Sequence, residues 1–133
     1  MTSIFSKIAS CEIPAYKVAE SNDFLAFLDV NPLVKGHVLV IPKKETDYIF
    51  DVEDEEFKNL FAFAKNVARA IKKVISCKRI GVAVIGLEVP HAHIHLIPIS
   101  KMKDMDFSNE KLQLTKDEFL EISAKIKEAF NDA

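Results

Sequence analysis

The sequence predicts an α+β domain in which an antiparallel sheet packs on helices. Three observations favour this class. Short apolar runs rich in β-branched residues, bounded by proline and glycine, occupy the first third of the chain. One long amphipathic pattern follows, and two further apolar runs separate it from a last helical pattern. Runs of strands separated by one long helix are typical of α+β proteins with an antiparallel sheet.

Turn residues and hydrophobic periodicity give the order of the elements. A short helix is expected over 3–10, before the proline at position 14. Apolar runs predict strands at 15–20, 23–29, 37–42, 80–85 and 89–97. Apolar residues at three- and four-residue spacing predict the long helix over 52–75. Thr115 and Glu118 have the spacing of a capping box and open the last helix, whereas 100–114 carry no clear pattern.

Length and composition limit the class of protein. The 133 residues suit one domain, 1–133, that can bury its own core. Apolar residues make up 49% and charged residues 29%, which excludes collagen-like, disordered and low-complexity chains. Cys11 and Cys77 stand alone, so we expect free thiols in a reducing, cytoplasmic compartment. No apolar run approaches the ~20 residues that span a bilayer, so no membrane partner is expected.

The charge balance bears on the partner. The chain has 18 Lys and Arg against 20 Asp and Glu, a formal net charge of −2. A domain that binds duplex nucleic acid normally concentrates a basic excess on one face. We therefore expect no nucleic-acid partner, and a phosphate-bearing partner would be a small molecule held in a pocket.

Three of the four histidines lie in one short segment, at His91, His93 and His95. Alternate side chains of a strand project to opposite faces, so we expect the three imidazoles on one face and the apolar residues between them on the other. A single histidine is usually a hydrogen-bonded core residue. Three in strict alternation indicate a site instead.

Two chemistries suit such a row. The first is metal binding, because neutral imidazole is the commonest metal ligand. Residues two apart in a strand lie about 6.5–7 Å apart, so one ion would reach only two neighbouring histidines of the row. It would then need His37 or Glu88 as a third ligand. An extended anionic substrate fits the row better. Crowded imidazoles disfavour simultaneous protonation, which leaves at least one neutral and nucleophilic near pH 7. It can attack phosphorus without a metal, while its neighbours donate to the phosphate oxygens.

The segment from His91 to Pro98 resembles the signature of the histidine-triad (HIT) family, in its bacterial Hint-like branch. Blocks at 12–18, 26–32 and 35–43, and the last helix from Leu114, resemble that family in the same order. The resemblance covers residues 3–128. It implies a HIT-like fold with a five-stranded antiparallel sheet, usually doubled in a homodimer, and hydrolysis or transfer at the α-phosphate of a bound nucleotide.

The resemblance also implies roles for the histidines. His93 would be the nucleophile that becomes nucleotidylated. His91 and His95 would flank it, orienting the ring and binding phosphate oxygens. His37 would complete the cluster, with a purely structural histidine at the start of a strand as the alternative.

Upstream positions would hold the nucleoside. Asp29 lies where the family uses a carboxylate to accept from the ribose hydroxyls, and Phe27, Leu28 and Val30 would form the base pocket around it. Asp29 also precedes the turn at 31–32, where an aspartate often bonds only to the local backbone. For Phe27 and Val30 the alternative is a place in the core.

The chain departs from the family at the positions where zinc-carrying branches hold their metal. Zinc-carrying branches place Cys-x-x-Cys near the N-terminus, where this chain has Ser3 and Ser6, and a further histidine where it has Glu45. Hydroxyls are poor zinc ligands beside thiolates. We therefore expect neither a structural zinc nor another cofactor.

The loop before the histidines also differs, since it is several residues shorter and lacks the family's asparagine and glutamine. Gly86 remains, and it would let the backbone approach a phosphate. Glu88 stands where some relatives have a serine near the leaving group. It could protonate a leaving amine or position water, or it could be a solvated loop acid.

The sequence thus predicts a nucleotide hydrolase or transferase that uses a covalent nucleotidyl-histidine. The expected partner is a small-molecule purine nucleotide, either a nucleoside phosphoramidate or a dinucleotide polyphosphate. Two alternatives stay open: a nucleotide-binding module with little turnover, and a metal-dependent hydrolase that uses the histidine cluster.

Overall fold

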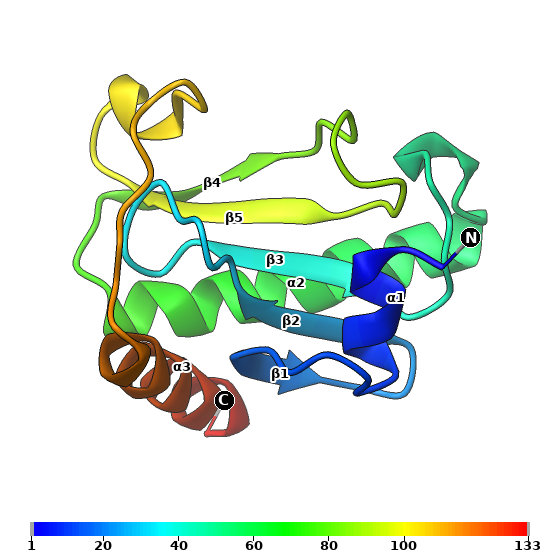
Figure 1. Cartoon of the computed structure of the whole chain (residues 1–133), viewed down its shortest axis with the longest axis horizontal. Helices are drawn as coiled ribbons and strands as arrows, with labels where there is room; N and C mark the ends of the chain where they lie inside the picture. Colours follow the sequence, from blue (N-terminus) through cyan, green and yellow to red (C-terminus); the bar gives the residue numbers. More distant parts are fainter. Residues whose placement is uncertain (1, 133) are drawn as a thin grey trace.

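The computed structural model, which describes residues 2–132, contains one five-stranded antiparallel sheet in the order β1-β2-β3-β5-β4 (Figure 1). The strands are β1 (Lys17–Glu20), β2 (Phe24–Leu28), β3 (Val38–Pro42), β4 (Arg79–Ala83) and β5 (Ile94–Ile99). The helices are α1 (Ile4–Ala9), α2 (Asp54–Val74) and α3 (Lys116–Asn131), with short 3-10 turns η1 (Ile49–Asp51) and η2 (Met102–Met105). The predicted α+β class is confirmed.

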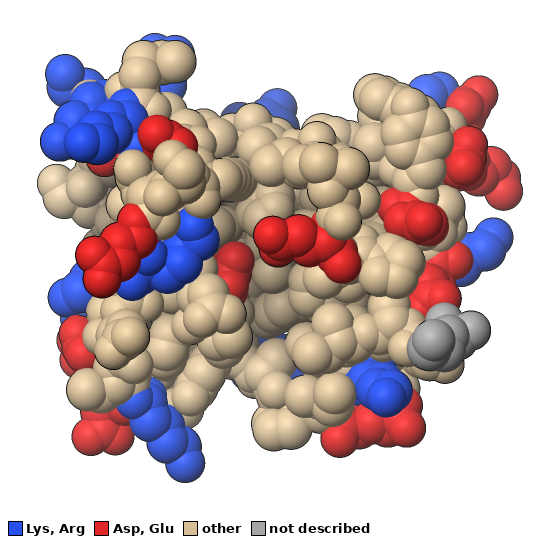
Figure 2. Space-filling view, turned by 45° about the horizontal axis from the view of Figure 1, so that its top comes forward, with Lys and Arg blue, Asp and Glu red and all other residues tan. Residues whose placement is uncertain are grey.

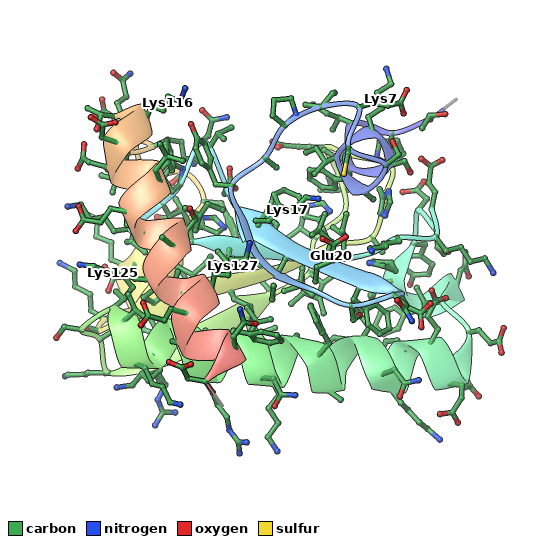
Figure 3. The ribbon with its side chains drawn as sticks, turned by 90° about the horizontal axis from the view of Figure 1, so that it is seen from below. Lys7, Lys17, Glu20, Lys116, Lys125 and Lys127 are labelled. Atoms are coloured by element: carbon green, nitrogen blue, oxygen red, sulfur yellow. The ribbon has the colours of Figure 1, made fainter. Side chains whose placement is uncertain are left out.

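Helices cover both faces of the sheet, with α1 on one side and α2 on the other (Figure 3). Strand β2 shows why its sequence is apolar throughout. Ala26 and Leu28 pack towards α2, while Leu25 and Phe27 pack with Phe5 of α1. A strand buried on both faces shows no polar alternation, and all five residues of β2 are buried.

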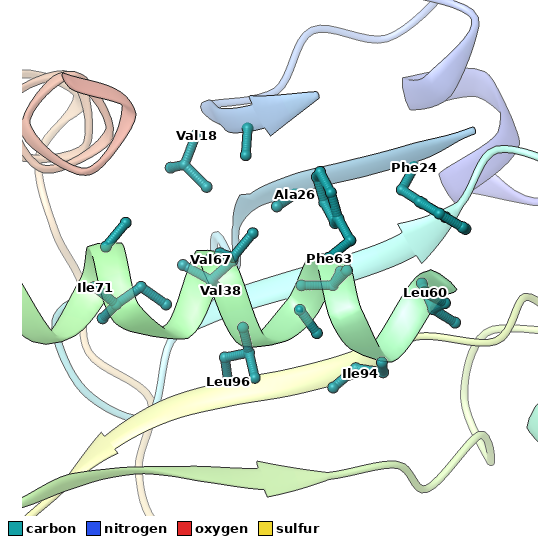
Figure 4. Close-up of a cluster of buried hydrophobic side chains, with 14 of the residues drawn as sticks. Val18, Phe24, Ala26, Val38, Leu60, Phe63, Val67, Ile71, Ile94 and Leu96 are labelled. Carbon is teal, nitrogen blue, oxygen red and sulfur yellow. The ribbon is translucent and has the colours of Figure 1, made fainter. Parts of the chain in front are cut away.

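The long helix α2 supplies most of the core on its side of the sheet. Its apolar stripe buries Leu60, Val67 and Ile71 against residues such as Val38 of β3 and Ile94 of β5 (Figure 4). Helix α3 begins with the predicted capping box. The Thr115 side chain accepts from the Glu118 amide, and the Glu118 carboxylate accepts from the Thr115 amide.

Two predicted strands are wrong in their boundaries, and these errors bear on the site. The expected strand at 89–97 begins only at Ile94, and the preceding strand ends at Ala83 rather than at 85. Pro90 has no amide hydrogen for a strand ladder, and Gly86 adopts a φ of 77°. The His91 amide donates instead to the Val89 carbonyl at 2.8 Å. The chain therefore forms a loop up to position 93.

None of the helices within residues 2–132 combines the length and the apolar character that crossing a bilayer requires. Basic and acidic side chains are intermingled on the face that Figure 2 draws, where no continuous basic surface is seen.

The packing of α2 predicts the cost of truncating its buried stripe. Replacing Ile71, which is fully buried, with alanine should lower the free energy of unfolding by about 2–5 kcal/mol, because it leaves a cavity between helix and sheet. Leu120→Ala is the matched control, since Leu120 is 47% exposed on α3 and should cost only about 0.5 kcal/mol. Urea unfolding of both variants checks this, and equal losses would contradict the assignment of the core.

Candidate active site

Loops from both ends of the sheet enclose a cavity of about 330 Å³ beside the histidines. They are the β2–β3 loop, the β4–β5 loop with the start of β5, and the segment between η2 and α3. The lining residues are Asp29, Asn31, Leu33, His37, Ile85, Gly86, Leu87, Glu88, His93, His95, Phe107 and Lys111. The structure thus brings together six of the predicted site residues: Asp29, His37, Gly86, Glu88, His93 and His95.

Hydrogen bonds fix the orientation of His37 and His95. The Leu33 amide donates to His37 Nδ1 at 3.1 Å, so the His37 proton is on Nε2. That Nε2–H donates to His95 Nδ1 at 2.9 Å. In neutral His95 the remaining proton is therefore on Nε2. The relay from the Leu33 backbone through two rings makes His95 a hydrogen-bond donor at the cavity.

His93 carries its proton on the other ring nitrogen, Nδ1, whereas neutral His37 and His95 carry theirs on Nε2. Its Nδ1 lies 2.8 Å from the His91 carbonyl oxygen, which can only accept, so Nδ1 carries the proton. In neutral His93, Nε2 then has a free lone pair. The His93 and His95 ring centroids are 4.9 Å apart, and Phe5 of α1 packs edge-on against His93 at 5.0 Å. The cavity is thus lined by one imidazole with a free lone pair and one with an N–H group.

Burial keeps His37 and His95 neutral. Desolvation, followed by the proximity of His95, lowers the pKa of His37 to about 3. Desolvation and then His93 lower the pKa of His95 to about 4. Burial also raises the pKa of Asp29. Oδ1 of Asp29 accepts from the Asn31 amide at 2.8 Å, the local bond that was the alternative for this residue, while Oδ2 lies 3.6 Å from His37 Nε2.

His91 is not part of this cavity, and the expectation that three histidines share one exposed face is wrong. Its side chain is fully buried. Nε2–H donates to the Pro42 carbonyl at 2.7 Å, and Nδ1 accepts from the Ser3 hydroxyl at 2.8 Å. Because the strand begins only at Ile94, strand alternation does not hold at position 91, and the ring lies between α1 and the end of β3.

A second cavity of about 340 Å³ adjoins the first and shares with it Asp29, Asn31, Glu88, His93 and His95. Phe27, Leu28 and Val30 also line it, together with apolar residues of α1 and the following loop. Phe27 is buried and packs edge-on against Phe5, Leu28 also belongs to the core beside α2, and Val30 is 58% exposed. The predicted base-pocket residues therefore lie beside the histidine cavity.

Sequence reasoning missed the residues that close the cavity from the segment after η2. Phe107 packs edge-on against His95, with ring centroids 4.9 Å apart. The Lys111 ammonium donates to the carbonyls of Phe107 and Asn109, at 2.5 and 3.0 Å. The Leu112 amide donates to the Pro32 carbonyl at 2.9 Å, which ties the segment to the β2–β3 loop. No periodicity marks residues 100–114, so only this long-range pairing identifies them.

One group of side chains in this cavity has the composition of a metal site. Ligand atoms of Asp29, His37 and His95 all lie within 4.8 Å of one another. A cation bound there would have to break the hydrogen bond between the two imidazoles, because that bond uses His37 Nε2 and His95 Nδ1. The predicted set was two neighbouring strand histidines with His37 or Glu88 as the third ligand. The observed group keeps His37 and one strand histidine, and Asp29 stands in place of the second.

Comparison with known proteins shows the family of this chain. The HIT domain matches residues 10–102. The chain belongs to the HIT family. A HIT-like protein of Borreliella burgdorferi is 37% identical over 131 residues, which cover 92% of this chain and 94% of the relative.

Two relatives of this HIT protein carry named activities. Adenosine 5'-monophosphoramidase HNT1 of Saccharomyces cerevisiae is 38% identical over 96 residues, which cover 71% of this chain and 61% of that one. The asymmetrical bis(5'-nucleosyl)-tetraphosphatase of Schizosaccharomyces pombe is 35% identical over 92 residues, which cover 65% of this chain and 49% of that one.

Solved structures share the fold. A HIT-like protein from Bartonella henselae superposes with a TM-score of 0.83 at 30% identity, covering 96% of both chains. A zinc-bound histidine-triad protein from Mycobacterium smegmatis superposes with a TM-score of 0.81 at 25% identity, covering 99% of this chain and 95% of that one.

The lowered pKa values predict a pH dependence of stability. Between about pH 3 and 6.5 the unfolded chain binds more protons than the folded one at His37 and His95, so the free energy of unfolding should fall as pH is lowered from 7 towards 4. Imidazole NMR titrations should show both rings neutral at pH 5.5, with urea-unfolded protein as the control. Midpoints near 6.5 for both rings in the folded protein would contradict this prediction.

Proposed function

We propose that this protein is a nucleotide hydrolase or transferase that acts at the α-phosphate of a nucleoside phosphoramidate or a dinucleotide polyphosphate. The observation that carries the proposal is the tautomer of His93, whose Nδ1–H is held by the His91 carbonyl. The lone pair on Nε2 is then available for attack on phosphorus. The two named relatives, which act on nucleotide phosphoramidates and on dinucleotide tetraphosphates, support this substrate class.

The reaction proceeds in two displacements. His93 Nε2 attacks the α-phosphorus, and the bond from phosphorus to the leaving nitrogen or oxygen breaks with its electron pair. A leaving amine gains one proton in this half. Water then attacks the same phosphorus, the bond to Nε2 breaks, and the water loses one proton as the nucleoside monophosphate is released. Glu88, which lines both cavities, is the candidate carrier of this proton.

His95 and Gly86 stabilise the charge that develops on the phosphate. The Nε2–H of His95 is available because His37 holds the other nitrogen at 2.9 Å, so the donor needs no reorientation during the reaction. A Cβ at Gly86 would meet no atom within 4 Å, and its φ is 77°. The phosphate can therefore approach the backbone of this loop closely.

The second cavity is the place for the nucleoside. Phe5, Phe27 and Val30 offer apolar surface for a purine ring. Asp29 keeps Oδ2 at the boundary of the two cavities, since Oδ1 is occupied by the Asn31 amide, and this oxygen can accept from ribose hydroxyls. The base and the α-phosphate would then lie on opposite sides of Asp29.

The proposed role of His93 as nucleophile predicts that its removal lowers turnover and leaves nucleotide binding intact. His93→Ala should lower hydrolysis of adenosine and guanosine phosphoramidates, measured with EDTA present, by at least about 1000-fold. Monophosphate binding by calorimetry should remain, because the apolar cavity and Asp29 are unchanged. Lys65→Ala on the exposed face of α2 is the control. Full activity of His93→Ala would refute the mechanism, EDTA-sensitive turnover would favour metal chemistry at the histidine cluster, and binding without any turnover would favour a binding module.

A homodimer formed through β4 is also part of the proposal. This strand forms one edge of the sheet, and Val82 on it is 54% exposed. An exposed apolar sheet edge is a ready surface for pairing with a second copy of the same strand.

The edge strand predicts an effect on oligomeric state. Val82→Lys should convert the dimer to a monomer in sedimentation velocity, because the pairing would bring two ammonium groups together in the interface. Leu120→Lys, on exposed α3, should leave the dimer intact. A monomeric wild type, or an unchanged mass for Val82→Lys, would exclude this interface.

A further inference from the structure

Four polar side chains from three parts of the chain meet around His91, and none of the four lines either cavity. Ser3 and Ser6 belong to the start of α1, Glu45 follows β3, and His91 lies in the β4–β5 loop. The Ser3 hydroxyl lies 2.8 Å and the Ser6 hydroxyl 3.3 Å from His91 Nδ1. Glu45 Oε1 accepts from the Ser6 hydroxyl at 2.7 Å and from the Ser3 amide at 2.6 Å.

The shortest contacts assign the hydrogens of this cluster, since the alternative contacts between the two hydroxyls and from Ser6 to His91 are both 3.3 Å long. His91 Nε2–H donates to the Pro42 carbonyl, so Nδ1 must accept, and the Ser3 hydroxyl is the closest donor. The Ser3 oxygen in turn accepts from the Ser6 amide at 3.0 Å. The Ser6 hydroxyl then donates to the Glu45 carboxylate. Every group has a partner, and Ser3 and His91 are both buried.

The charges agree with this assignment. The backbone and hydroxyl hydrogen bonds from Ser3 and Ser6 lower the pKa of Glu45 to about 2, so the carboxylate stays ionised. Burial lowers the pKa of His91, so its ring stays neutral and Nδ1 keeps its lone pair.

The cluster is connected to the nucleophile through one residue. The carbonyl of His91 accepts the Nδ1–H of His93, and the next amide, that of Ala92, donates to the Thr46 carbonyl beside Glu45 at 2.6 Å. Phe5, between Ser3 and Ser6, packs edge-on against both rings, at 6.0 Å from His91 and 5.0 Å from His93. A shift of His91 would therefore move the carbonyl that orients His93.

The donor set does not suit the zinc ion found in one solved relative. Structural zinc sites use thiolate and imidazole ligands, whereas this cluster offers two neutral hydroxyls, one carboxylate and one imidazole. The lone pair of His91 that could bind a metal already accepts the Ser3 hydroxyl. Hydrogen bonds occupy the groups that a metal would need.

We propose that Ser3, Ser6 and Glu45 form a metal-free hydrogen-bonded clamp that holds His91 and thereby positions His93 for attack on the nucleotide. The clamp ties α1, the end of β3 and the β4–β5 loop together without a bound ion. These three are positioning residues. Their effect on turnover rests on the proposed function, while the metal-free clamp itself does not.

The first test concerns metal and needs no activity. Elemental analysis of purified wild type should find zinc far below one ion per chain. The variant Ser3→Cys/Ser6→Cys/Glu45→His should bind about one zinc per chain, and its cobalt form should show thiolate charge-transfer absorption. Ser10→Cys/Glu12→His, placed on exposed residues after α1, is the control and should bind none tightly. Stoichiometric zinc in the wild type that Ser3→Ala removes would overturn the proposal.

The second test concerns the orientation of the rings. Imidazole nitrogen NMR of the wild type should show a proton on Nε2 of His91 and on Nδ1 of His93. Ser3→Ala should shift the signals of both rings and lower kcat about tenfold with KM little changed, because binding contacts remain while the nucleophile is misplaced. Ser3→Thr should restore both readouts, and Ser10→Ala, which lies outside the clamp, should change neither.

The outcomes separate the two proposals. Unchanged His91 and His93 signals in Ser3→Ala would overturn the clamp even if the enzyme is active. Shifted signals with a wild type that turns over no nucleotide would support the clamp and refute the proposed function. If the triple variant does not fold, the metal content of the wild type and the Ser3→Ala spectra still decide.

Discussion

The hydrogen bond from His93 Nδ1–H to the carbonyl of His91 is the interaction on which the proposed chemistry of this site depends. A neutral imidazole has one protonated and one free nitrogen, and this bond decides that the free one is Nε2. The bond requires the backbone at 91–93 to leave the strand geometry, which Pro90 and the burial of His91 enforce. The same departure that removes His91 from the cavity therefore gives His93 its acceptor.

The other polar groups of the site are arranged by the same kind of one-directional bond. The Leu33 amide decides the tautomer of His37, and His37 decides that of His95. Burial keeps the rings neutral, so protons are not free to redistribute among them near pH 7. Backbone groups of two loops thus set the donor and acceptor pattern of side chains that lie between them. Such preorganisation would place the proposed nucleophile and a donor side by side before a substrate arrives.

The fold and much of the site could be predicted from the sequence because both depend on local patterns. The period of apolar residues gave α2 its place within about two residues, and the Thr115–Glu118 spacing gave the start of α3. Five apolar runs gave the five strands. The histidine row was predicted from its alternation and Asp29 from the HIT resemblance, because both signals lie in short contiguous motifs. Residues 106–112 could not be found, since their place over His95 depends on pairing with the distant Pro32 backbone.

The sequence by itself predicted which elements form, which residues are candidates for the chemistry, and that Ser3, Ser6 and Glu45 lack the thiolates of a usual zinc site. Only the tertiary structure decided that these three converge on His91, that His91 lies behind the cavity while His93 and His95 line it, and which nitrogen of each ring carries the proton. The physical reason is that periodicity reports burial along one segment. A tautomer or a hydrogen-bonded clamp depends on atoms tens of residues apart in the chain, and their directions are fixed only when the helices and the sheet pack together.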